Sequence, residues 1–190
     1  ERRIALEVDT SSRNINSGLY EITISAAASD TDKIKGSDTF NLDYWNPTHY
    51  FQIRPDDGDE ITFAKDVLGI LTIGKRNTIQ KIYTEGAITT WSISSPFSYI
   101  GCVAPYSAES TQYGIFYLGR DGEYRFTGQN SELLSDIVAS TIDDISEVYY
   151  DNVSAKFFKN EYTLSFTSKS SGEATNDTVL LYDTIRKAYV

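Results

Sequence analysis

The sequence is poor in the residues that most reactive and metal-binding sites use. Its 190 residues include one cysteine, one histidine and no methionine. A single cysteine excludes an intrachain disulfide framework, and the apolar neighbours of Cys102 predict a buried small hydrophobe and not a reactive thiol. His49 has no second histidine and no cysteine nearby, so we expect no metal role for it, because a metal site needs several convergent ligands. Since position 1 is not methionine either, we expect a processed chain or a piece of a longer one.

Basic residues and long apolar runs are also scarce. Lys and Arg number 17 against 27 Asp and Glu, which gives a formal net charge of -10. Phosphate binding depends mainly on Lys and Arg, so we expect no tight binding to nucleic acid and none to an anionic membrane surface. The longest apolar runs fall well short of the roughly 18 residues that a membrane helix needs. No set of residues indicates a reaction, and we expect neither an enzyme nor a cofactor.

Aromatic residues, in contrast, are abundant, with 14 Tyr, nine Phe and two Trp. Large flat side chains pack well on a pleated surface, and many segments alternate apolar and polar residues as half-buried strands do. These features predict an all-β fold. Residues 131–148 are the exception, because their apolar residues follow near-helical spacing and predict one short helix with its carboxylates in solvent.

One short phrase occurs twice. Gly69-Ile-Leu-Thr-Ile-Gly74-Lys-Arg returns 45 positions later as Gly114-Ile-Phe-Tyr-Leu-Gly119-Arg-Asp. Two aromatic pairs keep an interval of 46 residues: Trp45 with Trp91, and Phe51 with Phe97. A third copy is weaker in sequence, but it has the same order of strands from Val153 and places Tyr189 where the others have Trp45 and Trp91. A fixed period of this size indicates a repeat architecture.

The first copy also resembles a phosphate-binding loop, Gly-x-x-x-x-Gly-Lys followed by Ser or Thr. We reject that interpretation, since Arg76 stands where a hydroxyl must bind magnesium and no helix pattern follows to offer its N-terminus to a phosphate. The glycines are better explained as strand boundaries, with Lys75 as a surface charge. In the second copy, Asp121-Gly122 predicts a tight hairpin turn, and the return strand carries Glu123 and Arg125 on the face opposite Tyr124 and Phe126.

A period of about 45 residues with four short strands per unit is typical of β-propeller blades. We therefore expect a β-propeller or a segment of one, with blades of antiparallel strands at residues 46–97, 98–150 and 151–190. Residues 99–105 are expected to be an apolar strand of the second blade, and residues 1–45 a strand hairpin that is a partial blade or a junction. A β-sandwich would not explain the repeated phrase. Because at most four blades are visible, a segment of a larger propeller is the favoured interpretation.

An acidic turn precedes the first copy. Asp56, Asp57 and Asp59 have the oxygen density that a calcium ion requires, but the turn lacks the spaced ligands and distal Glu of a 12-residue calcium loop. We favour a solvated Asp-Gly turn between strands. A calcium-stabilised scaffold stays open as a minor alternative.

Several motifs resemble the β-propeller proteins of tailed bacteriophages, which lie at the head-to-tail junction or in the tail. The motifs are Asp56-Asp-Gly-Asp-Glu-Ile-Thr62, Gly69 to Tyr83, Ile100-Gly-Cys-Val-Ala-Pro105, Tyr117-Leu-Gly-Arg-Asp-Gly-Glu-Tyr124 and Arg186-Lys-Ala-Tyr189, where the family usually has Trp in place of Tyr189. The resemblance covers residues 50–190, and residues 1–45 have none.

The resemblance implies a non-enzymatic structural protein of the virion, in a symmetric assembly with other virion proteins at the head-to-tail connector or tail. A negative wall would suit a DNA path because it does not grip passing phosphates. The alternative from another class is a glycan-binding or glycan-cleaving propeller, with Asp56, Asp59 and exposed Tyr or Trp as its site, since paired carboxylates and aromatic platforms serve sugar chemistry. Blade number, oligomeric state and position in the virion are not determined by the sequence.

Overall fold

The structure is a computed structural model that describes residues 4–5, 15–17, 20–22, 32–36, 50–55, 57–84, 90–171 and 174–190. Trp45, His49 and Asp56 lie outside these residues. The described chain consists mostly of antiparallel strands with one short α-helix, which confirms the predicted all-β class. Among these residues, no helix has the length and apolar character needed to cross a bilayer.

Three sheets have the same construction, four consecutive strands that pair antiparallel in chain order. The first sheet comprises β6 (Ile61–Val67), β7 (Ile70–Lys75), β8 (Ile79–Tyr83) and β9 (Ser92–Ile93). The second comprises β10 (Glu109–Thr111), β11 (Gly114–Leu118), β12 (Glu123–Phe126) and β13 (Ser131–Leu133). The third comprises β14 (Ser154–Phe158), β15 (Glu161–Phe166), β16 (Thr178–Asp183) and β17 (Ala188–Tyr189).

The N-terminal region is built differently from the prediction. β1 (Ile4–Ala5), β4 (Lys33–Gly36) and β5 (Tyr50–Gln52) form a three-stranded N-terminal sheet, while β2 (Ile15–Ser17) pairs only with β3 (Tyr20–Ile22). Within residues 1–45, the hairpin that the structure describes is the short pair β2 and β3, and β1 pairs with β4 instead. β5, which we placed in the first blade, belongs to the N-terminal sheet because it pairs with β4.

Left-handed residues mark the turn before the second strand of each four-stranded sheet. Leu68 and Gly69 have φ of 53° and 82°, and Lys159 and Asn160 have φ of 49° and 68°. Two consecutive residues with positive φ make a turn whose twist suits a two-residue hairpin. Gly114 begins β11 with φ of 120°. The repeated glycine of the sequence is thus a turn residue, and Asn160 takes its place in the third sheet, because asparagine tolerates the left-handed region.

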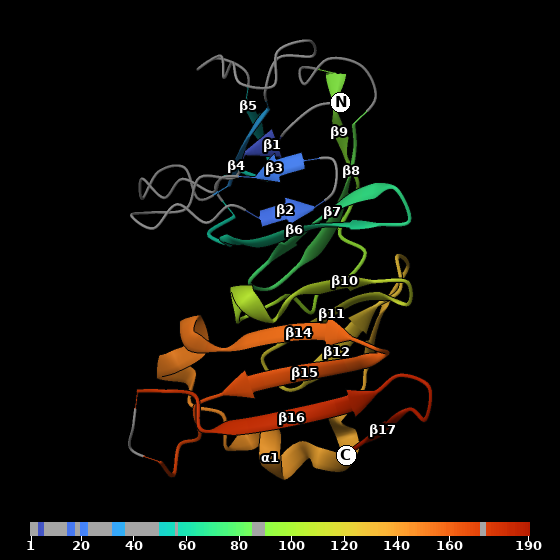
Figure 1. The fold of residues 1–190 in the computed structure, drawn as a ribbon. Helices are drawn as coiled ribbons and strands as arrows, with labels where there is room; N and C mark the ends of the chain where they lie inside the picture. The colour runs from blue at the N-terminus through green and yellow to red at the C-terminus, as the bar shows by residue number, and fades with distance from the viewer. Residues whose placement is uncertain are drawn as a thin grey trace.

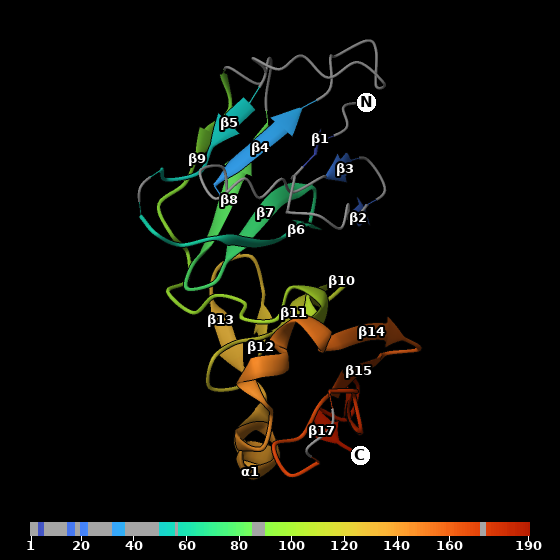
Figure 2. The same cartoon turned by 90° about the vertical axis from the view of Figure 1, so that its left-hand side faces the viewer.

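The sheets stack face to face in chain order (Figures 1 and 2), and a hydrophobic cluster fills each contact. Ile34 and Ile53 pack with β7 residues Leu71 and Ile73. Between the first and second sheets lie Phe63, Val67, Ile115, Tyr117, Tyr124 and Phe126. Between the second and third lie Phe116, Leu118, Tyr162, Leu164, Phe166, Leu180 and Tyr182. The second sheet is therefore covered on both faces, which explains why all five residues of β11 are buried.

The first strands of the three sheets lie side by side, since β10 contacts both β6 and β14. The Ser110 hydroxyl donates to the main-chain oxygen of Asp66 at 2.6 Å. At the next contact, the Tyr113 hydroxyl donates to Asn160 Oδ1 at 3.3 Å. The three first-hairpin turns consequently line up along one side of the stack, on the right of Figure 1.

The expected strand at residues 99–105 is wrong. Cys102 donates its main-chain N–H to the oxygen of Lys75 at 3.0 Å, and Val103 donates to the oxygen of Leu118 at 3.0 Å. The segment therefore bridges two sheets instead of joining one, and a 3₁₀ turn, η2 (Pro105–Ser107), ends it. Cys102 is fully buried, as predicted, and burial raises the pKa of its thiol to about 11.

Residues 131–148 contain the predicted short helix, but it is only α1 (Ala139–Asp143). It follows the 3₁₀ turn η3 (Ser135–Val138) and precedes η4 (Glu147–Asn152). The apolar spacing that predicted the helix places Ile142 and Ile145 in the cluster between the second and third sheets.

At two further glycines, a side chain would not fit against its neighbours. A Cβ at Gly74 would lie 2.1 Å from the Phe63 ring, so this glycine is required inside β7 and is not a strand boundary. The predicted Asp121-Gly122 turn is displaced by one residue, because Gly119 donates its N–H to the oxygen of Gly122 at 2.8 Å and leaves Arg120 and Asp121 at the centre. A Cβ at Gly122 would meet a methyl of Leu133 at 2.4 Å.

Candidate functional site

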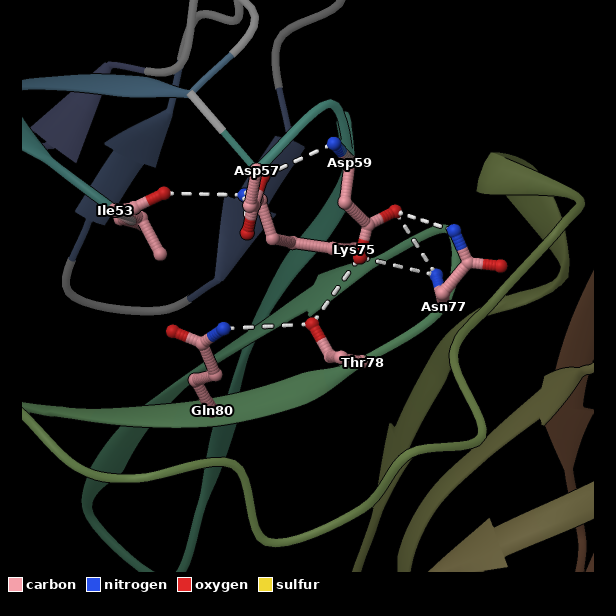
Figure 3. Close-up of polar contacts among 7 residues, drawn as sticks. All are labelled: Ile53, Asp57, Asp59, Lys75, Asn77, Thr78 and Gln80. Atoms are coloured by element: carbon pink, nitrogen blue, oxygen red, sulfur yellow. Dashed lines mark hydrogen bonds and ion pairs between the residues drawn. The ribbon is translucent and has the colours of Figure 1, made fainter. Parts of the chain in front are cut away.

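The acidic turn before β6 is tied to the hairpin of β7 and β8 (Figure 3). Residues 57–60 end the connection from the N-terminal sheet, and their side chains reach the turn at residues 75–78. Each of the three described carboxylates in this turn has a basic or hydrogen-donating partner there. We call this group the acidic clamp: Asp57, Asp59, Glu60, Lys75, Arg76, Asn77 and Thr78.

Lys75 is the centre of the acidic clamp. Its side chain has no exposed surface, and its Nζ donates to the two carboxylate oxygens of Asp57 at 2.7 and 2.8 Å. The same Nζ donates to the main-chain oxygen of Ile53 at 3.1 Å. The predicted surface charge is therefore wrong. A buried ammonium requires a paired charge and additional hydrogen bonds, and Lys75 has both.

Asp59 holds the neighbouring turn through neutral donors. Its carboxylate accepts from the Asn77 main-chain N–H at 3.0 Å, from Asn77 Nδ2 at 3.0 Å and from the Thr78 hydroxyl at 3.2 Å. Gln80 Nε2 in turn donates to the Thr78 hydroxyl at 3.3 Å. Since only 9% of Asp59 is exposed, the predicted solvated turn is wrong for this residue. Glu60 and Arg76 form an ion pair at the surface.

The acidic clamp is suited to anchoring a turn. The ammonium of Lys75 lies between the carboxylate oxygens of Asp57, where a metal ion would bind, and would repel a cation. Calcium binding would require Asp57 to leave Lys75 buried without its counter-charge. In the part of the chain that the structure describes, no three His, Cys, Asp or Glu side chains gather as metal ligands do.

The aromatic repeat markers lie at the fourth strands. Trp91 directly precedes β9, is buried, and packs against Phe51 with ring centroids 6.4 Å apart. Tyr189 lies in β17 and packs against Tyr182 at 5.1 Å. The second sheet has no aromatic residue in β13. Their function as equivalent markers with Trp45 stays a prediction.

A line of charges crosses the first strands, and no sequence pattern indicated it. Lys65, Glu109 and Lys156 each lie two residues before the end of their strand, opposite Thr72, Phe116 and Thr163 respectively. Burial lowers the pKa of Lys65, while Glu109 raises it and Lys156 lowers it, so the three groups interact. The intervals between them are unequal, so the period of the repeated phrase does not reveal this line.

No protein-family model matches the chain, and neither does any curated protein.

Proposed function

We propose that the chain is a segment of a β-propeller and serves as a non-enzymatic structural component of a tailed-phage virion, at the head-to-tail connector or in the tail. The observation that carries the proposal is the succession of three four-stranded antiparallel sheets, stacked face to face in chain order. Propeller blades have this construction, and their first strands gather around a central channel.

The arrangement of first strands supports the propeller. β10 lies between β6 and β14, and the line of Lys65, Glu109 and Lys156 would face the channel. The N-terminal sheet covers the free face of the first sheet through Ile34 and Ile53, as a neighbouring blade would. Such a stack is a rigid body with buried contacts between its units, and rigidity is what an adaptor between virion proteins requires.

The virion role rests on the motifs that resemble phage propellers and on the net charge of -10. In a symmetric assembly with other virion proteins, an acidic lining would let DNA pass without binding. Purified particles of a phage that encodes the chain provide the test. We expect the chain in intact particles at a fixed stoichiometry, with immunogold label at the head-to-tail junction or tail. Recovery of the chain only from the soluble fraction of lysed cells would contradict the virion role. Tight binding of the purified chain to duplex DNA would contradict an acidic lining that DNA passes without binding.

A second candidate, glycan binding, is favoured by one observation. The site that the sequence suggested is unsuitable, since Asp59 is buried and bonded to Asn77 and Thr78. Exposed aromatic rings instead occur at the first-hairpin turns, where the Tyr113 hydroxyl donates to the side-chain oxygen of Asn160 and Phe158 ends β14. A glycan array separates the candidates. Binding that is lost in Tyr113→Ala and Phe158→Ala, and kept in the exposed control Tyr99→Ala, would support this function.

A further inference from the structure

Glu123 is a carboxyl group without access to solvent. It lies in β12 and is 0% exposed, although its alternation with Tyr124 predicted a polar face. Tyr124 and Phe126 face the first sheet, so Glu123 and Arg125 face the third sheet, which covers them. The main chain of Glu123 is satisfied by Ser135 and Leu134. The side-chain carboxyl lacks such hydrogen bonds.

Unpaired polar atoms gather around this carboxyl. Among the described residues, neither oxygen of Glu123 has a hydrogen bond of good geometry, and the nearby Tyr189 hydroxyl and Nε of Arg125 are likewise buried without one. Four of the six buried unpaired side-chain atoms in the described residues therefore belong to this one contact. Buried polar groups are usually satisfied, so an unsatisfied cluster calls for an explanation.

The ionisable groups facing Glu123 come from every strand packed against it. Tyr162 of β15, Tyr182 of β16 and Tyr189 of β17 interact with it across the contact. Arg125 and Glu132 lie along the same face of the second sheet, and they form an ion pair with each other. Nη2 of Arg125 is thus paired with Glu132 and not with Glu123. Burial raises the pKa of Glu123 to about 8, and the close Tyr189 hydroxyl lowers it only partly.

We propose that Glu123 is a pH-sensitive latch, which holds β17 against the second sheet while its carboxyl is protonated and releases that strand when the carboxyl ionises. The neutral acid needs no counter-charge and has the Tyr189 hydroxyl beside it. The ionised form would be a buried charge without an ion pair, since Arg125 is paired with Glu132, so the charged state favours conformations in which β17 leaves and the carboxylate becomes solvated.

β17 is suited to such release. It is two residues long and, among the described strands, pairs with β16 alone, through Tyr182 opposite Tyr189 and Asp183 opposite Ala188. One further hydrogen bond, from the Val190 N–H to the Leu181 oxygen at 2.9 Å, extends the pairing. A short outer strand opens at a small fraction of the cost of global unfolding, so its protection from exchange reports the latch directly.

Hydrogen exchange of the Val190 amide, corrected for intrinsic exchange, tests the proposal. We expect its protection factor in the unmodified chain to fall by more than about tenfold between about pH 6 and pH 8.5. Opening of β17 lets the Glu123 carboxyl lose its proton, so opening becomes more favourable as the pH rises. In Glu123→Gln, which cannot ionise, the protection should change little. The matched control is the Ser94 amide, which donates to Lys81 at 3.0 Å beside the outer strand of the first sheet, and it should not respond in either chain.

A direct titration keeps the proposal testable if Glu123→Gln does not fold. The ¹³C signal of the Glu123 carboxyl in the unmodified chain should titrate near pH 8. A midpoint near the ordinary value of about 4.5 would overturn the latch, and so would equal losses of Val190 protection in the unmodified chain and in Glu123→Gln.

Discussion

Lys75 and Glu123 are both fully buried ionisable residues in neighbouring sheets, yet Lys75 has a partner of opposite charge and Glu123 has none. Lys75 meets a carboxylate at 2.7 Å and a main-chain oxygen at 3.1 Å. Glu123 has only the Tyr189 hydroxyl close to its carboxyl and no ion pair, and Arg125 on the same face of the second sheet is paired with Glu132. One buried group is therefore held in its charged form and the other in its neutral form, within the same stack of sheets.

This difference indicates which buried group stabilises the stack at all pH values and which one makes a contact between sheets depend on pH. A satisfied buried pair resists change, because removing either partner leaves an uncompensated charge. An unsatisfied carboxyl near its pKa makes the contact between the second and third sheets depend on proton concentration. The acidic clamp is thus a permanent tie, and the contact at Glu123 is adjustable.

The largest effect should come from pH acting on Glu123. Its pKa is raised in the folded chain, so the folded state binds more protons and stability falls as pH rises from about 4.5 to about 8, by at most about 1.4 kcal/mol per pH unit. The free energy of unfolding of Glu123→Gln relative to the unmodified chain, measured in urea, should be near zero at pH 5 and rise to several kcal/mol at pH 8.5. A difference independent of pH would show that the carboxyl is already ionised in the folded chain.

Breaking the acidic clamp should have the next largest effect. Asp57→Ala leaves the Lys75 ammonium buried without a counter-charge and should destabilise the chain by about 3 kcal/mol. The control in the same turn is Glu60→Ala, whose ion pair with Arg76 is exposed and should contribute less than about 1 kcal/mol. Urea unfolding followed by circular dichroism measures both. Equal losses in the two variants would mean that burial does not distinguish the pairs.

The packing at Gly74 should give an intermediate effect. Gly74→Ala forces its new methyl into the Phe63 ring and should cost about 2 kcal/mol, as overpacking does. Gly58→Ala has open space but positive φ, so we expect only about 1 kcal/mol from backbone strain. If Gly58→Ala cost more stability than Gly74→Ala, backbone conformation would limit these glycines more than the packing of β6 on β7 does.

The smallest effect should come from a hydrogen bond that joins the third sheet to η2. The Tyr162 hydroxyl is buried and donates to the Ser107 oxygen at 2.7 Å. Tyr162→Phe should cost about 1 kcal/mol, because it leaves that oxygen unpaired. Tyr113→Phe, which loses an exposed bond to Asn160, is the control and should cost less. If Tyr162→Phe is neutral, the bond does not contribute to the contact.

The strands with clear alternation were predicted well, and those fixed by tertiary contacts were not. β15 follows its alternating pattern, with Tyr162, Leu164 and Phe166 buried. β10 was missed because Glu109-Ser-Thr111 has no apolar residue and is a strand only through its partner β11. Lys75 and Glu123 were misjudged for the same reason. A charged residue in an alternating strand looks solvent-exposed in sequence, and only the neighbouring sheet shows that it is covered.

The first strands of three successive sheets lie side by side, which is the arrangement expected around a propeller axis. Long-range nuclear Overhauser effects in the purified chain measure this arrangement directly. We predict that β10 and the turn after it show contacts to both neighbours at once, from Ser110 to Asp66 of β6 and from Tyr113 to Asn160 at the turn after β14. Contacts from β10 to only one of these strands, with the other sheet packed elsewhere, would contradict the account.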